Sequence, residues 1–216
     1  MINNLKNLIL GVYTNRIDYI GQLLNSIQEF NFKVPIIVQI ENGSVGYNMC
    51  KLREYFLNQN KRFWVFLDDD ITFLNELILR KALLDMLSNN MAVTGVYQTF
   101  SDSVCVEYKN GILNEKLKFK YTDWVPGYFM MVDSEKIKDV EIDTSIPGNT
   151  GFDLDYCLNV KNLGFNIGLS PSLVKHVYCK YGNVTPFNAR ESNEFIAKKW
   201  GNLFTKTNMF IDNTIN

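Results

Sequence analysis

Three consecutive aspartates, Asp68, Asp69 and Asp70, follow the apolar run 63–67 and are the residues of this chain best suited to chemistry. An apolar run of this length, with aromatic and β-branched residues, predicts a buried strand. Carboxylates at the carboxyl end of such a strand project into the crevice where open α/β sheets bind ligands. Adjacent carboxylates repel each other, and a divalent cation such as Mg²⁺, Mn²⁺ or Ca²⁺ relieves that repulsion. The alternative is a solvated acidic turn, although such turns usually contain Gly, Ser or Asn.

The composition limits the class of protein. The 216 residues suit one α/β domain, and 46% apolar residues can fill a sizeable core. The formal charge of −1 provides no basic footprint for duplex nucleic acid, although a basic patch can be hidden in a neutral total. Four scattered cysteines without a C-x-x-C pair suggest reduced thiols, and no apolar stretch is long enough for a signal peptide or a membrane span. We therefore expect a cytoplasmic protein.

The first hundred residues alternate between strand and helix patterns. The predicted strands cover residues 8–12, 34–40 and 63–67, and the predicted helices cover 17–30, 45–56 and 75–88. This alternation predicts a mostly parallel sheet flanked by helices, in the Rossmann-like α/β class. In the second half, Asn110-Gly111 predicts a β-hairpin, and strands at 128–132 and 165–169 flank a helix at 153–163.

Polar residues follow most of these strands, and in a parallel sheet such residues converge on one crevice. They are Thr14-Asn15-Arg16, Glu41-Asn42-Gly43-Ser44 and the three aspartates; the pair Asp153 and Asp155 opens a late helix, and His176 comes after a further strand. The set suits nucleotide-sugar chemistry. A diphosphate leaving group needs a divalent cation, and attack on an anomeric carbon needs a carboxylate to accept the proton of the attacking group.

Each of these residues also has a structural alternative. His176 is the only histidine in the chain, and a single histidine can be a metal ligand or a packed structural residue. Asp153 and Asp155 lie in the first turn of a predicted helix, where they interact favourably with the helix dipole. This alternative is stronger for Asp155. Arg16 can pair with a phosphate or with a neighbouring acid, and Trp124 can contact a sugar or belong to the core.

Taken together, these motifs resemble those of a family 2 glycosyltransferase with the GT-A fold, from about residue 8 to residue 182. Glu41-Asn42-Gly43-Ser44 is similar to the family's acid-rich turn that holds the nucleotide base. The three aspartates resemble its D-x-D segment. The stretch 151–158 resembles the segment that carries the catalytic base, and His176 falls where many members have a metal-binding histidine.

The resemblance implies a metal-dependent, inverting hexosyl- or pentosyltransferase with a nucleotide-sugar donor, a UDP-sugar being the first choice. The acceptor stays open between a glycan, a lipid-linked sugar, a protein and a modified nucleobase. The chain would form a single domain, 1–216, with a donor half at 1–100, an acceptor and catalytic half at 101–200 and a polar tail at 201–216. The implied roles are Asp153 as base; Asp70 and His176 as ligands of Mn²⁺ or Mg²⁺; Thr14, Asn15, Arg16, Glu41, Asn42, Asp68 and Asp69 at the donor; and Trp124, Gly127 and Asp155 at the acceptor.

Two positions depart from the family pattern. Asn42 replaces the second acid of the base-binding turn, which leaves the choice of nucleotide open. Phe152 stands where many members have glutamate, so Asp153 lacks that neighbour.

Two other functions are compatible with the same acids. Asp68, Asp70 and Thr72 also fit the D-x-D-x-T motif of haloacid-dehalogenase-like phosphatases, with Asp68 as the nucleophile. That superfamily usually begins with this strand, whereas about sixty residues precede it here. A non-catalytic nucleotide- or glycan-binding module would need the metal-binding acids but not the base.

Overall fold

The computed structural model describes residues 2–14, 17–40, 44–99, 117–148, 150–176 and 186–201. The strands are β1 (Leu8–Thr14), β2 (Ile36–Ile40), β3 (Phe63–Asp68), β4 (Ile71–Phe73), β5 (Met91–Thr99), β6 (Lys120–Thr122), β7 (Phe129–Asp133) and β8 (Asn166–His176). The helices are the 3-10 helix η1 (Ile2–Asn7), α1 (Ile17–Glu29), α2 (Val45–Leu57), α3 (Ile78–Ser88), α5 (Ser134–Ile137), α6 (Phe152–Asn162) and α7 (Pro186–Trp200).

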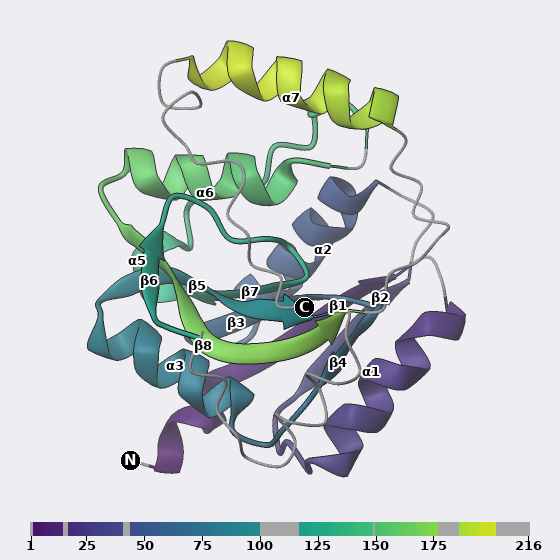
Figure 1. Ribbon diagram of the computed structural model, residues 1–216, viewed down its shortest axis with the longest axis vertical. Coiled ribbons are helices and arrows are strands. Elements are labelled where there is room, and N and C mark those ends of the chain that lie inside the picture. Colours follow the sequence, from purple (N-terminus) through teal and green to yellow (C-terminus); the bar gives the residue numbers. More distant parts are fainter. Residues whose placement is uncertain are drawn as a thin grey trace.

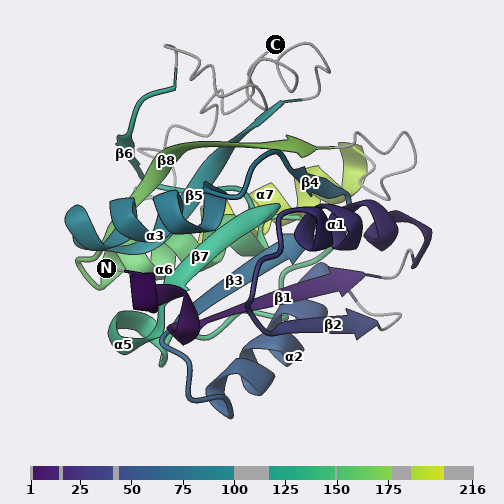
Figure 2. The ribbon, with the colours of Figure 1, turned by 90° about the horizontal axis from the view of Figure 1, so that it is seen from below.

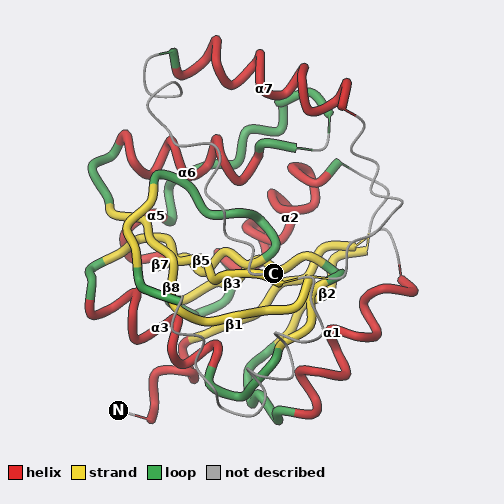
Figure 3. The backbone as a smooth tube through the Cα atoms, viewed as in Figure 1, coloured by secondary structure: helices red, strands yellow, loops and turns green. Residues whose placement is uncertain are grey.

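One sheet lies between two layers of helices (Figures 1 and 3). Helices α1 and α3 contact one face, through β4, β5 and β8, while α2 and α6 cover the other. Helix α7 lies outside α6 and forms a further layer. None of the helices in the described part of the chain has the length and apolar content needed to span a bilayer.

The strand order brings the two halves of the chain together in a single sheet. It is β2-β1-β3-β7-β5-β8-β4, with β6 paired to β8 (Figure 2). Strand β1 is parallel to β2 and β3, and β5 is parallel to β8, whereas β7, β4 and β6 run antiparallel to their neighbours. The predicted α/β class, with a helix-flanked sheet that is parallel over much of its width, is therefore confirmed.

The central strand β3 explains why the aspartates lie where they do. All five residues of the run 63–67 are at most 3% exposed, because helices cover both faces of the strand. On the face covered by α2, the Phe56 ring of that helix packs against Trp64 and Phe66. The buried apolar run ends at Asp68, the last residue of the strand, which is half-buried.

Some elements differ from the predictions. The helix predicted at 75–88 begins only at Ile78 in the structure. Residues 71–73, a few positions before it, form the short strand β4. Strand β5 was not predicted, since Thr94, Gly95 and Gln98 interrupt its apolar pattern, and neither was α7. Strand β8 continues beyond the predicted end at 169 to His176. The hairpin predicted around Asn110-Gly111 and the tail beyond residue 201 lie outside the described residues.

Candidate active site

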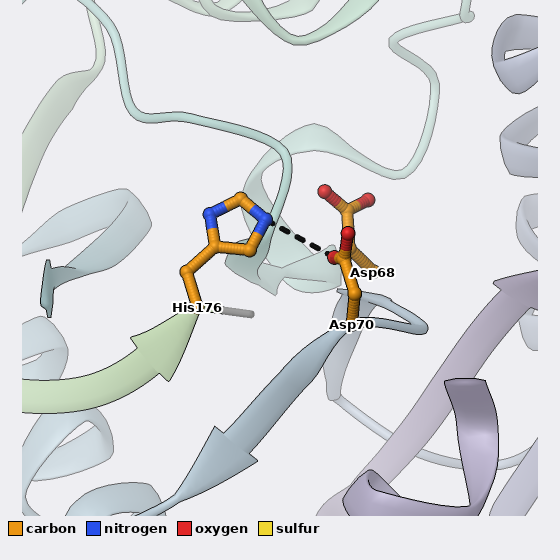
Figure 4. A group of neighbouring side chains, drawn as sticks. All are labelled: Asp68, Asp70 and His176. Atoms are coloured by element: carbon orange, nitrogen blue, oxygen red, sulfur yellow. Dashed lines mark hydrogen bonds and ion pairs between the residues drawn. The ribbon is translucent and has the colours of Figure 1, made fainter. Parts of the chain in front are cut away.

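Two aspartates and the single histidine meet at the edge of the sheet (Figure 4). Asp68 ends β3, Asp70 lies in the turn before β4, and His176 ends β8. One ligand atom from each lies within 4.8 Å of the other two, and His176 Nε2 is 3.0 Å from Asp70 Oδ1. The antiparallel pairing of β4 with β8 produces this contact, because it sets Ile71 opposite His176. Two of the residues predicted at the metal, 106 positions apart, are thus neighbours in space.

The imidazole of His176 is held from two sides. Its Nδ1 lies 2.6 Å from Oε1 of Gln98 on β5, and its ring centroid is 5.4 Å from that of Tyr128. The glutamine carbonyl can accept a hydrogen bond from Nδ1–H, and the ring then directs Nε2 towards Asp70. Tyr128 is itself fixed, because its hydroxyl donates to the Val96 carbonyl at 2.6 Å. In this orientation Nε2 is the ring atom that would bind a cation, in the neutral form of the imidazole, while Gln98 holds Nδ1–H.

The last two residues of β1 orient two of the aspartates. The Tyr13 hydroxyl donates a hydrogen bond to Asp68, and the Thr14 hydroxyl donates to Asp69 at 2.5 Å. Asp69 is only 2% exposed, so its carboxylate points into the protein. In the parallel pairing of β1 with β3, Tyr13 lies opposite Asp68. The three consecutive aspartates therefore have different surroundings.

Asp68 has an altered protonation equilibrium. Burial, and then the nearby charge of Asp70, raise its pKa from the usual 3.8 to about 7, although Tyr13 and His176 favour the ionised form. Without a metal ion, the Asp68 carboxyl is therefore still partly protonated near pH 7. A bound divalent cation would reverse this effect by favouring the ionised form.

We expect the variant Asp68→Asn to stabilise the metal-free protein above neutral pH. The native carboxyl ionises only above about pH 7, whereas in the unfolded chain it ionises near pH 3.8, so the stability of the wild type falls as pH rises between these values. In EDTA at pH ~8 the variant should melt about 10 °C higher than the wild type, since the shift from 3.8 to about 7 corresponds to roughly 4 kcal/mol and each 1 kcal/mol to roughly 2–4 °C for a chain of this size. The gap should close towards pH ~4, and a gap that is independent of pH would contradict the assignment.

Asp153 lies in the first turn of α6. Its Oδ2 accepts the Gly127 N–H at 2.8 Å and its Oδ1 accepts the Leu154 N–H at 2.9 Å. Burial raises its pKa, while these two amides oppose the shift. The Trp124 indole also favours the ionised form, although its N–H is outside hydrogen-bonding geometry with any described residue. A carboxylate with a raised pKa is a better proton acceptor.

The hydroxyl of Tyr13 lies near both the metal-ligand aspartates and Asp153. It donates to Asp68, and a Cβ placed on Gly127 would lie 3.5 Å from this hydroxyl and 3.7 Å from Asp153 Oδ2. Burial, followed by the charges of Asp68 and Asp153, raises the pKa of Tyr13 well above its usual value of 10. The phenol therefore stays protonated at neutral pH and is a permanent donor to Asp68.

The start of α6 is fixed by close contact with α2. A Cβ on Gly46, in the first turn of α2, would overlap the ring of Phe152. Only glycine allows this approach, so Phe152 fills the place beside α2 with an apolar contact. Ser44 caps α2 by accepting the Tyr47 amide at 3.2 Å. The departure from the family pattern at Phe152 thus has a packing role here.

The remaining predicted site residues fall into two groups. Asn15, Arg16, Glu41 and Asn42 lie outside the described residues, and their roles stay predictions. Asp155 is fully buried, and its carboxylate faces α7 instead of the sheet edge. The structure therefore does not bring Asp155 to the acids at the strand ends.

Sequence reasoning missed Tyr13 and Gln98, which orient the predicted ligands. Tyr13 directly precedes Thr14, and the strand register places it opposite Asp68. Gln98 is a polar residue near the end of β5, and it would have been noticed if that strand had been recognised. The useful signal in both cases is a hydrogen-bonding side chain near the carboxyl end of a strand beside an acidic one.

The ligand chemistry of the cluster fits a divalent cation. Asp68 and Asp70 provide oxygen ligands, which suit Mg²⁺ and Mn²⁺, and His176 adds a nitrogen. The carboxylate charges, which oppose each other in the metal-free protein, become favourable beside a cation. Within the described residues these three side chains can hold a metal ion.

No protein-family model and no curated protein matches the sequence. Among solved structures the chain is similar to S. aureus TarS 1–349, with a TM-score of 0.56 and 14% identity over 89% of this chain and 64% of that chain. It is also similar to the mannosyltransferase PcManGT from Pyrobaculum calidifontis, solved with GDP-Man and Mn²⁺, with a TM-score of 0.58 and 11% identity over 82% and 58% of the two chains. GalNAc-T7, solved with UDP, GalNAc and Mn²⁺, has a TM-score of 0.59 and 8% identity over 92% and 49%.

These similarities confirm the GT-A fold. The chain spans less than two thirds of the length of each of these three proteins.

Proposed function

We propose that this protein is a metal-dependent, inverting glycosyltransferase that uses a nucleotide-sugar donor. The observation that carries the proposal is the meeting of Asp68, Asp70 and His176 at the strand ends of a GT-A fold, with the Asp153 carboxylate near Tyr13, the residue that holds Asp68. The solved neighbours support this choice of donor, since TarS was solved with UDP-GlcNAc and PcManGT with GDP-Man and Mn²⁺. Mn²⁺ or Mg²⁺ is the proposed cofactor, and a UDP-sugar is the first donor to test.

The proposed residues divide the work of a direct displacement. Asp68, Asp70 and His176 would hold the divalent cation, which offsets the negative charge of the departing diphosphate when it is bound. Asp153 would accept the proton of the acceptor's hydroxyl or amine. At the same time the lone pair of the acceptor's oxygen or nitrogen attacks the anomeric carbon, and the bond from this carbon to the diphosphate breaks. Tyr13 and Gln98 would keep Asp68 and His176 in place. Attack from the face opposite the leaving group inverts the anomeric configuration.

A screen of nucleotide sugars tests this function. A ligand that binds only the native state raises the melting temperature, and a ligand at about 100 times its dissociation constant adds ~2.7 kcal/mol. We expect a subset of nucleoside diphosphate sugars to stabilise the protein with Mn²⁺ or Mg²⁺ but not with EDTA, and the true donor to be slowly hydrolysed to sugar and nucleoside diphosphate. The matching nucleoside without phosphates is the control.

Two other outcomes would contradict the proposal. Hydrolysis of a simple aryl phosphate that disappears in Asp68→Asn would indicate a phosphatase with an aspartyl-phosphate intermediate. Metal-dependent donor binding without turnover, and with no effect of Asp153→Asn, would indicate a binding module.

A further inference from the structure

Helix α7 packs on α6, the helix that has Asp153 in its first turn (Figures 1 and 3). Ile196 is fully buried against Leu154 and Leu158 of α6. Gly151, the residue before α6, has a φ of 85°, and a Cβ there would come within 2.5 Å of Ile196 Cδ1. Glycine at this position therefore permits both the left-handed backbone and the close approach of α7.

A group of polar contacts joins the end of α7 to the same region. The Trp200 indole N–H donates to Asp155 Oδ1 at 2.6 Å. Lys199 Nζ lies 2.9 Å from the same carboxylate oxygen and 2.7 Å from Asp143 Oδ2. We call these four residues, Asp143, Asp155, Lys199 and Trp200, the α7 clasp.

In the clasp the Lys199 ammonium lies between the carboxylates of Asp143 and Asp155. Asp155 is fully buried, so an uncompensated charge there would be unfavourable. Burial opposes the ionisation of Asp143, but hydrogen bonds from Lys199 and Ser145 outweigh it and lower its pKa to about 2. Near its middle, α7 is held by Ser192, whose hydroxyl donates to the Pro147 carbonyl at 2.5 Å.

Asp155 and Asp153 belong to the same helical turn. The Asp155 amide donates to the Gly151 carbonyl at 2.9 Å and closes that turn. Asp155 then faces α7, whereas Asp153 faces the Gly127 amide and Tyr13. Because the hydrogen-bonded backbone of a helical turn moves as a unit, anchoring Asp155 to α7 also fixes the direction in which the Asp153 side chain leaves the helix.

We propose that the α7 clasp positions the catalytic base, with Asp155, Lys199 and Trp200 as positioning residues for Asp153. This inference rests on the proposed role of Asp153. It assigns to Asp155 a role that needs no contact with the acceptor, and to helix α7 a role in the chemical step. The alternative is that α7 adds only stability.

The Gly127 amide reports directly on the position of the base, because it donates to Asp153 Oδ2 at 2.8 Å. Its hydrogen exchange can be measured by NMR without any substrate. The first test variant is Trp200→Phe, which removes one hydrogen bond to Asp155 and keeps an aromatic ring. The second is the double variant Asp155→Asn, Lys199→Met, which removes the charges of these two residues and leaves the carboxylate of Asp143 partly exposed, with its hydrogen bonds from Ser145. Lys198→Met, at the exposed neighbouring position, is the matched control.

We expect both clasp variants to exchange the Gly127 amide about tenfold faster while the amides of β3 keep their protection. Donor hydrolysis in the presence of Mn²⁺ should fall about tenfold with unchanged donor affinity, because only the proton acceptor has moved. Lys198→Met should match the wild type in all three measurements.

The result that would overturn the inference is a Gly127 exchange rate equal to that of the wild type in both clasp variants. Faster exchange with normal hydrolysis, in a protein that Asp153→Asn inactivates, would also overturn it and would leave the proposed function intact. If Asp153→Asn hydrolyses the donor as fast as the wild type, the proposed base is wrong. The Gly127 exchange rate then still decides whether the clasp orients this carboxylate.

Discussion

Replacing Asp153 by asparagine should reduce sugar transfer by about 10²–10⁴-fold, the usual worth of a general base. The amide has nearly the same shape as the carboxylate but cannot accept the acceptor's proton. Donor affinity should be almost unchanged, because the proton moves only as the new bond forms. Burial, which raises the pKa of Asp153, makes this carboxylate a stronger base than an exposed one.

The measurement is the transfer rate together with the donor dissociation constant, with donor hydrolysis in place of transfer until an acceptor is found. Asp155→Asn is the comparison at the neighbouring acid. It keeps a hydrogen-bond acceptor for Trp200 and should lower the rate far less than Asp153→Asn. An inactive Asp155→Asn beside an active Asp153→Asn would show that the base has been assigned to the wrong carboxylate.

Replacing Asp70 by asparagine should abolish Mn²⁺-dependent donor binding in a protein that remains folded. The change removes one negative charge and one good oxygen ligand from the group formed with Asp68 and His176. Loss of a partner that only orients a ligand typically costs 10–100-fold in metal affinity, and loss of a ligand should exceed about 100-fold. The fold should tolerate the change, because the charge of Asp70 works against the ionisation of Asp68.

Calorimetric titration of a nucleoside diphosphate with Mn²⁺ measures this effect. Gln98→Ala is the graded control, since it removes only the hydrogen-bond partner of the His176 imidazole, and its affinity should lie between those of the wild type and Asp70→Asn. The assignment fails if Asp70→Asn is folded and binds the metal–nucleotide pair as the wild type does. It also fails if the wild type binds the nucleotide equally well in EDTA.

The sequence predicted those parts of the molecule in which one local pattern dominates. The run 63–67 was recognised because a strand covered on both faces must be apolar at every position. The position of Asp70 at the sheet edge followed from that strand. His176 was predicted as its partner only through the family resemblance, since nothing local relates two residues 106 positions apart.

The parts that were missed depend on contacts between distant segments. Gln98 is a polar residue within a strand and carries no local motif. Only its contact with His176 gives it a role. Asp155 has the same local signal as Asp153, an acid in the first turn of a helix. Their different surroundings come from α7, whose first residue lies about thirty positions further along the chain.

The place of β8 in the sheet has a consequence for biosynthesis. This strand lies between β5 and β4, although both precede it in the chain by about seventy residues or more. While the ribosome makes the intervening segment, β5 and β4 each present an unpaired edge, which is a template for aggregation. Pairing over such a sequence separation is also slow, because the loop must close before the contacts can form. The nascent protein is therefore most in need of chaperone protection until β8 emerges, and the last residue of that strand is His176.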